Sequence, residues 1–389
     1  MAILVIGNGF DLAHGLPTKY EHFLEFVKVF RAMNPITMTE DNEEDSISHD
    51  DLHNELYSFV YEFRCEQSKT FQEAFEIRKR ENLLLEHFLS VYEELCKKGC
   101  GDWIDFESEI AKIVQAFDKA LLELRNGEQI SPKALDNIRS CLIVHHEGMP
   151  ETSRIRINQE VLLERGQRLY NDLNDITRLL EIYLTEFVEK KKTGKQLPVI
   201  ANLRNITGVI SFNYTHTYQK LYGNDKTKYC YIHGQTKTDS SAESSNLVLG
   251  INEYLRDGRE NDDNTFIWFK KFYQRIYKET DSTYIDWLDG HEHANEVMEK
   301  LKPTILDIFF YGHSLDITDK DVVSRLILHN NAQIYIYYRN KDDMAQKITN
   351  LVKVIGQENL IRMTRGEKRV IRFLEICENA EPKMDNLDV

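Results

Sequence analysis

The sequence of 389 residues contains no apolar run that approaches the roughly 20 residues needed to cross a bilayer. Its hydrophobic first segment is too short for a secretory signal peptide and lacks the basic residues of one. No C-x-x-C pair occurs among the six cysteines, Cys65, Cys96, Cys100, Cys141, Cys230 and Cys377. Scattered cysteines are typical of reduced thiols rather than of a disulfide framework or a zinc site. We therefore expect a cytoplasmic protein without a structural metal.

Positive charge is also scarce, since the formal net charge is −15 at pH 7. A chain of this charge repels a phosphate backbone, which disfavours nucleic-acid binding. The sequence has no strong basic patch, and Lys190–Lys192 is expected to be a solvated helix end. Acidic residues dominate Thr39–Asp51, which predicts a linker. The length allows two domains, or one large domain with an insertion.

Proline is absent between Ile36 and Ser131. Within this stretch, Leu52–Leu124 is rich in helix formers, and its apolar residues recur every three or four positions. A second periodic segment covers about Asn158–Val188. The pattern predicts a mainly α-helical insertion domain over residues 36–195. It interrupts an α/β domain made of residues 1–35 and 196–389.

Short β-branched and aromatic runs follow Leu197, and several are almost unbroken in hydrophobicity. This texture is typical of a parallel sheet that is covered on both faces. The predicted strands are Gly208–Phe212, Tyr229–Ile232, Leu247–Gly250, Ile305–Tyr311, Ala332–Tyr338 and Asn359–Met363, with helices over Asp319–His329 and Asp342–Ile355. The fold class is therefore α/β, with an open, mostly parallel, Rossmann-like sheet.

The N-terminus, Met1–Pro17, has the pattern of a buried strand that enters a glycine-bracketed turn. Gly7 and Gly9 lack a Cβ, which would let backbone N–H groups approach a phosphate closely. A helix is predicted to begin near Lys19, where Thr18 and Glu21 have the spacing of a capping box. Leu12 stands where the dinucleotide fingerprint requires glycine, so a plain structural turn remains an alternative to a nucleotide site.

Polar residues follow four of the apolar runs. In an open α/β sheet, ligands bind outside the carboxyl ends of the strands, so these residues are candidates for one common site. Each also has a structural interpretation, such as a turn cap or a helix cap. The four segments are Gly7–Asp11, Ser211–Thr215, Tyr231–Gly234 and Gly312–Asp316.

Taken together with Trp103–Glu107, the segments Gly7–Tyr20, Ser211–Thr215, Ile232–Gly234 and Tyr311–Asp316 resemble the bacteriophage abortive-infection AbiH family over nearly the whole chain. That family is similar in turn to sirtuin-like (sirtuin- and DHS-like) proteins, whose α/β fold binds a nicotinamide dinucleotide. The resemblance implies a role in phage defence, with NAD as substrate or ligand.

The resemblance also implies roles for single residues. Gly7, Asn8, Gly9 and Phe10 would contact the dinucleotide, with the two glycines at the pyrophosphate. A second ribose-contacting loop would consist of Gly312, His313 and Ser314.

Asn213 would correspond to the asparagine that orients ribose and water, and His233 to the histidine before glycine. Thr215 stands where an aspartate commonly follows that asparagine, and no four-cysteine zinc module follows Ile232–Gly234. Protein deacylation is therefore disfavoured.

With deacylation disfavoured, the reaction that these residues still allow is cleavage of the nicotinamide–ribose bond. Histidine exchanges protons near neutral pH, so His233 is the predicted base, and the neutral amide of Asn213 would orient water. Asp11 would contact a ribose hydroxyl or stabilise the developing cation, although it could also simply cap the next segment. The predicted function is an NAD glycohydrolase in abortive infection.

Two other functions stay open. The first is a non-enzymatic, nucleotide-dependent sensor or interaction protein, in which a phage protein could act as trigger and the chain could form a homo-oligomer. The second is a serine hydrolase that uses Ser314 in a G-x-S-x-G-like turn, with His329 as the only histidine after it. The clusters His145–Glu147 and His291–His293 lack the spacing of a zinc protease, which favours surface polar groups.

Overall fold

The computed structural model describes residues 1–33, 51–98, 104–142, 157–194, 196–238, 240–255, 258–259, 262–297, 303–367 and 369–376. The chain divides into two compact units. We call the first the sheet unit; it comprises Met1–Pro17, Val188–Thr236 and Lys278–Val389. The second, the helical unit, comprises Thr18–Phe187 and Lys237–Tyr277. Residues 18–35 and 237–277 thus belong to the helical unit, whereas the sequence-based division assigned both segments to the α/β domain.

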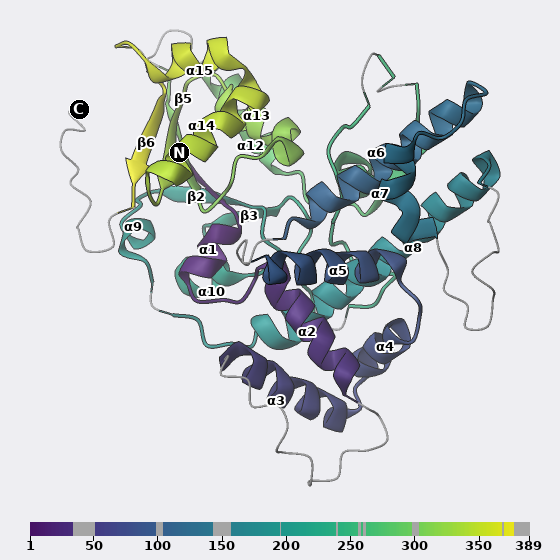
Figure 1. The fold of residues 1–389 in the computed structure, drawn as a ribbon. Coiled ribbons are helices and arrows are strands. Elements are labelled where there is room, and N and C mark those ends of the chain that lie inside the picture. Colours follow the sequence, from purple (N-terminus) through teal and green to yellow (C-terminus); the bar gives the residue numbers. More distant parts are fainter. Residues whose placement is uncertain are drawn as a thin grey trace. The chain divides into compact units, whose positions relative to one another are not determined.

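The sheet unit is built on a six-stranded parallel sheet (Figure 1). Its strands are β1 (Ala2–Ile6), β2 (Ile206–Ser211), β3 (Lys228–Tyr231), β4 (Leu306–Tyr311), β5 (Ala332–Tyr338) and β6 (Ile371–Glu375). Their spatial order is β3-β2-β1-β4-β5-β6. This is the strand order of doubly wound dinucleotide-binding folds. The predicted open parallel α/β sheet is confirmed.

Alternating side chains of each strand pack into two separate cores. Ile3 and Val5 of β1 face one core, and Leu4 and Ile6 face the other. The first core is covered by α12 (Tyr284–Val297), α13 (Lys320–Ile327), α14 (Lys341–Ile355) and α15 (Gln357–Thr364). The second is covered by α1 (Asn8–Ala13), α9 (Pro198–Ala201) and α10 (Thr217–Tyr222). The sheet is therefore buried on both faces, which explains the near-continuous apolar runs of its strands.

Two of the predicted strands are wrong, and one strand of the sheet was not predicted. Asn359–Met363 lies inside helix α15, because a short apolar run has no periodicity that separates strand from helix. Leu247–Gly250 is buried but is no strand; instead the Gln274 side chain accepts from Leu249 N and donates to Leu249 O, at 3.2 and 3.0 Å. The edge strand β6 was missed, since Arg372 and Glu375 interrupt its apolar pattern.

The helical unit contains α2 (Tyr20–Ala32), α3 (Asp51–Glu66), α4 (Lys69–Arg78), α5 (Leu83–Lys97), α6 (Phe106–Arg125), α7 (Pro132–Leu142), α8 (Gln159–Tyr183), a π-helical turn η1 (Leu184–Val188) that runs into the sheet unit, a 3₁₀ turn η2 (Ile267–Phe269) and α11 (Lys271–Tyr277). Aromatic rings fill its core: Phe106 stacks on Phe88 with centroids 4.1 Å apart, and Phe26 stacks on Tyr183 at 5.2 Å. The predicted mainly α-helical character of the insertion is confirmed in its described residues. The predicted linker Thr39–Asp51 lies outside the described residues, except for Asp51 at the start of α3.

The start of α2 differs from the predicted capping box. Lys19, not Thr18, is the N-cap residue, and its N–H donates to His22 Nδ1 at 3.3 Å. The carboxylate of Glu21 accepts a hydrogen bond from Ile104 N at 2.7 Å. Glu21 therefore holds the chain before α6 rather than the end of its own helix.

Candidate functional site

The strand order of the sheet reverses between β1 and β4. In folds of this kind, ligands bind in the crevice outside the carboxyl ends of the strands at such a switch point. The residues that follow β1 and β4 are Gly7–Asp11 and Gly312–Asp316, two of the four segments selected from the sequence. The other two follow the neighbouring strands β2 and β3. Topology therefore brings all four segments to one edge of the sheet.

The turns after β1 and β4 touch each other through their backbones. Gly7 N donates to Tyr311 O at 3.2 Å, and Gly9 N donates to Gly312 O at 2.9 Å. A Cβ on Gly7 would lie 2.7 Å from His313 Cα, and one on Gly9 would lie 2.8 Å from Gly312 Cα. Glycine is thus required here for contact between two protein segments, and its approach to a pyrophosphate stays a prediction.

Phe10 and Asn8 have different surroundings. Phe10 is fully buried on the α1 side of the sheet, 4.4 Å from the ring of His14 and 6.0 Å from that of Tyr311. Its ring is part of the core, so only its backbone could contact a ligand. Asn8 is exposed at the start of α1.

Asp11 is a buried carboxyl on α1, with 1% of its surface exposed. Thr215 Oγ1 donates to Asp11 Oδ2 at 2.5 Å. The other oxygen, Oδ1, has no hydrogen-bond partner among the described residues. Burial raises the pKa of Asp11 to about 6, although the Thr215, Thr217 and Asn213 side chains lower it in part. A buried carboxyl that titrates near neutral pH and has an unsatisfied oxygen is typical of a functional group.

Asn213 connects the end of β2 to the end of β1. Its Nδ2 donates to Gly7 O at 3.0 Å, and its backbone N donates to Ser211 Oγ at 3.1 Å. The side chain is buried, with 6% of the residue exposed. Asn213 thus lies next to both Asp11 and the turn after β1.

His233 and His313 share one carboxylate. His233 Nε2 lies 2.9 Å from Asp319 Oδ1, and His313 Nε2 lies 3.6 Å from Asp319 Oδ2. The ring of Phe212 packs against both imidazoles, with centroid distances of 5.4 and 4.2 Å. All three polar residues are buried. The segments after β3 and β4 therefore meet at Asp319.

Sequence reasoning missed Asp319, which it treated only as the first residue of a helix. It also missed the cluster around Glu189, whose Oε1 accepts from His216 N at 2.7 Å and lies 3.0 Å from His216 Nδ1. Burial raises the pKa of Glu189, but hydrogen bonds from His216 and Lys220 outweigh it and bring the pKa to about 2. Neither Asp319 nor Glu189 directly follows a strand, so no local signal in the sequence marked them.

Ser314 does not have the surroundings of a hydrolase nucleophile. It is exposed, and its Oγ accepts from Asp316 N at 3.4 Å. His329 instead lies against His291, with 3.0 Å between Nε2 and Nδ1.

Among the described residues, no group of three His, Cys, Asp or Glu side chains is placed to hold a metal ion. His145–Glu147 and Trp103 lie outside the described residues, whereas Asp105 is the N-cap of α6.

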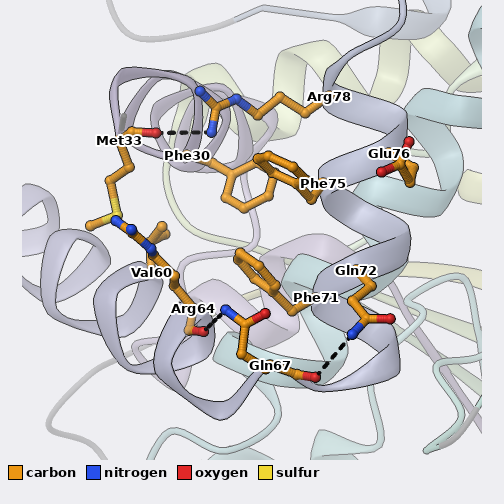
Figure 2. Close-up of a pocket in the computed structure, with 10 residues that line it drawn as sticks. All are labelled: Phe30, Met33, Val60, Arg64, Gln67, Phe71, Gln72, Phe75, Glu76 and Arg78. Atoms are coloured by element: carbon orange, nitrogen blue, oxygen red, sulfur yellow. Dashed lines mark hydrogen bonds between the residues drawn. The ribbon is translucent and has the colours of Figure 1, made fainter. Parts of the chain in front are cut away.

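The helical unit has a separate cavity of about 400 Å³ between α2, α3 and α4 (Figure 2). Aromatic rings of Phe30, Phe71 and Phe75 line it. The guanidinium of Arg78 donates to Met33 O and to Arg31 O, both at 2.9 Å, so it caps the end of α2. The lining is mainly apolar, and the acid–base groups described above belong to the sheet unit.

Residues 3–338 match the family model described as bacteriophage abortive infection AbiH. No curated protein and no solved structure matches the chain. In the described part of the chain, no helix is both long and apolar enough to cross a membrane.

Proposed function

Because this chain belongs to the bacteriophage abortive infection AbiH family, whose role is phage defence, we propose that it acts there by cleaving the nicotinamide–ribose bond of NAD. The strand order of the sheet, which is that of doubly wound dinucleotide-binding folds, supports NAD as the ligand. The observation that carries the proposal is the buried, partly unsatisfied carboxyl of Asp11 beside Asn213.

The chemistry of these residues fits a ribose. A ribose hydroxyl is a hydrogen-bond donor, and Asp11 Oδ1 is a buried acceptor without a partner among the described residues. The ionised carboxyl would also stabilise the positive charge that develops on the sugar. Thr215 occupies the position where an aspartate commonly follows the asparagine that corresponds to Asn213. The carboxylate of Asp11 accepts a hydrogen bond from Thr215 and would take the place of that aspartate.

In the proposed reaction the bond between ribose C1′ and the pyridinium nitrogen breaks, and its electron pair leaves with neutral nicotinamide. A water oxygen forms the new bond to C1′, which gives ADP-ribose. His233 accepts the proton that the water loses, and Asn213 orients the water. NAD and water thus yield ADP-ribose, nicotinamide and one proton.

The test is incubation of the purified protein with NAD, with nicotinamide and ADP-ribose quantified by chromatography. We expect release by the wild type and a loss of about 100-fold or more in Asp11→Asn and His233→Ala. The matched controls Asp225→Asn and His293→Ala change exposed residues and should retain the wild-type rate.

NAD should also fall in infected cells that express the wild type, and not in cells that express Asp11→Asn. Equal rates in all four variants, or stable NAD during a defended infection, would contradict the proposal.

A nucleotide-dependent sensor is the second candidate. It is favoured by the burial of Asn213 and His233, which expose 6% and 4% of their surface and already bond to protein groups. This function predicts NAD binding by calorimetry without turnover, in the presence as well as the absence of phage lysate.

A further inference from the structure

We propose that Asp319 is a positioning residue that holds His233 in the tautomer with the proton on Nε2, the same tautomer as that of His313, and thereby leaves the basic lone pair of His233 on Nδ1. The statement about tautomers stands on geometry alone. Its catalytic consequence rests on the proposed function, in which His233 accepts a proton.

The hydrogen bond of His313 fixes its tautomer. Leu315 N donates to His313 Nδ1 at 2.9 Å, so Nδ1 is the acceptor nitrogen and Nε2 carries the proton. That Nε2–H faces Asp319 Oδ2 at 3.6 Å. On its far side, the main chain of His313 is held by Lys347, whose Nζ donates to His313 O at 2.7 Å and pairs with Asp343 at 3.4 Å.

The same carboxylate fixes the tautomer of His233. An ionised carboxylate only accepts hydrogen bonds, so the 2.9 Å contact with Asp319 Oδ1 requires a proton on His233 Nε2. A neutral imidazole carries one proton, which leaves Nδ1 as its basic nitrogen. When Nδ1 takes up a proton, the adjacent carboxylate stabilises the imidazolium.

The place of Asp319 in the fold supports this role. It is the N-cap residue of α13, a position where aspartate usually accepts from backbone N–H groups of the first turn. Asp319 makes no such side-chain cap, and its two oxygens face the two imidazoles. In contrast, Asp316 nearby accepts from Thr318 N at 3.0 Å and caps the turn η3 (Ile317–Asp319).

The test is nitrogen NMR of the full chain labelled at its histidine side chains, because protonated and unprotonated ring nitrogens have well-separated shifts. His233→Gln and His313→Gln assign the two rings by loss of signal. In the wild type both rings should show a protonated Nε2 and an unprotonated Nδ1. In Asp319→Asn, His233 should lose this single tautomer, since an amide can donate as well as accept and therefore no longer requires a proton on His233 Nε2.

Two matched variants complete the experiment. Asp319→Glu keeps a carboxylate and should retain the Nε2–H tautomers, whereas Asp316→Asn changes a cap in the same segment and should leave both rings as in the wild type. A protonated Nδ1 on His233 in the wild type would overturn the proposal. So would identical ring signals in the wild type and in folded Asp319→Asn, with folding verified by circular dichroism.

Kinetics separate this inference from the proposed function. Asp319→Asn should slow NAD cleavage about 100-fold, with the exposed control Asp225→Asn unaffected. If the NMR outcome is as expected and no variant cleaves NAD, then the tautomer assignment stands and the glycohydrolase proposal fails. If the wild type cleaves NAD while its rings show the other tautomer, then this inference fails alone.

Discussion

Each unit contains one buried aspartate with a raised pKa: Asp11 in the sheet unit and Asp172 in the helical unit. In both residues, burial raises the pKa to about 6. Asp172 Oδ2 accepts from Leu83 N at 2.8 Å and from Leu84 N at 3.4 Å, at the start of α5. Asp11 accepts from the Thr215 hydroxyl, and its Oδ1 lacks a partner among the described residues. Burial raises the pKa of both carboxyls, but Asp172 accepts from two backbone N–H groups, whereas Asp11 has a buried oxygen without a partner among the described residues.

The comparison teaches that a raised pKa alone does not identify a functional group. Buried structural carboxyls cap helices or pair with cations, so their oxygens are occupied. A buried oxygen without a hydrogen-bond partner leaves part of the desolvation cost of its carboxyl group uncompensated. Such a cost is retained where a ligand supplies the missing donor, and it distinguishes Asp11 from Asp172.

The largest effect is expected from a buried charge with complete pairing. Arg178 on α8 binds Glu73 through two nitrogens and Glu181 through a third contact of 2.7 Å, and Glu181 is fully buried. Arg178→Met leaves Glu181 without its cation, so we expect a loss of about 3–5 kcal/mol in the free energy of unfolding, measured by urea denaturation. Arg168→Met, which removes a partly exposed pair with Glu81, should lose less than about 1 kcal/mol. Equal losses would contradict the role of pairing.

Asp11→Asn should stabilise the protein at neutral pH while it removes activity. The folded-state pKa of about 6 lies above the ordinary 3.8, so the stability from this group is complete below pH 4 and is lost as pH rises through 6. Relative to Asp11→Asn, the wild type should lose about 2.4 kcal/mol between pH 4 and pH 7. Urea denaturation at both pH values checks this, and Asp225→Asn should show no such difference. A variant less stable than the wild type at pH 7 would indicate a structural Asp11.

Comparing asparagine with alanine at each position sharpens the contrast. At position 172, asparagine retains an acceptor for the α5 N–H groups and alanine does not, so Asp172→Ala should be about 2 kcal/mol less stable than Asp172→Asn. At position 11 this difference should be less than half as large, because the hydrogen bond that the Asp11 side chain accepts comes from the Thr215 hydroxyl and not from the start of a helix. Thermal unfolding of the four variants measures both differences. Equal differences would break the comparison.

The smallest effect is expected at a buried histidine with complete partners. His14 Nδ1 donates to Phe10 O at 2.7 Å, and Tyr222 donates to His14 Nε2 at 2.8 Å while accepting from Leu197 N at 2.6 Å. Burial lowers the pKa of His14, which keeps this ring neutral. Tyr222→Phe should therefore cost about 1 kcal/mol in thermal unfolding, with NAD turnover unchanged. A loss of turnover would place His14 in the functional site.

The sheet was predictable where strands are fully buried. Ala332–Tyr338 was predicted with the bounds of β5, because both of its faces are covered and its run is almost unbroken. Helix α15 was mistaken for a strand because its apolar residues, Leu360, Ile361 and Met363, lie too close together to show a period. Strand β6 was not predicted because it is the edge strand among the described residues, and an edge strand tolerates charged residues such as Arg372 and Glu375.

The sequence allowed us to predict which residues belong to the candidate site, but not which side chains they contact. Strand ends selected Asp11, Asn213 and His233, since parallel strands place their carboxyl ends along one edge. Their partners Thr215 and Asp319 depend on which loops lie opposite, and strand order is a long-range property that local sequence does not encode. For the same reason, the glycines were matched to a phosphate when the segment facing them is Gly312–His313.

The backbone contact between the turns after β1 and β4 has a mechanical consequence. No side chain lies between Gly9 and Gly312, so no rotamer change can absorb a displacement of either turn. A displacement of the turn after β1 therefore shifts the backbone at His313. Because His313 and His233 both face the carboxylate of Asp319, the displacement also changes the surroundings of His233. The position of the first turn of the protein is thus coupled to the position of the His233 imidazole, more than two hundred residues later in the sequence.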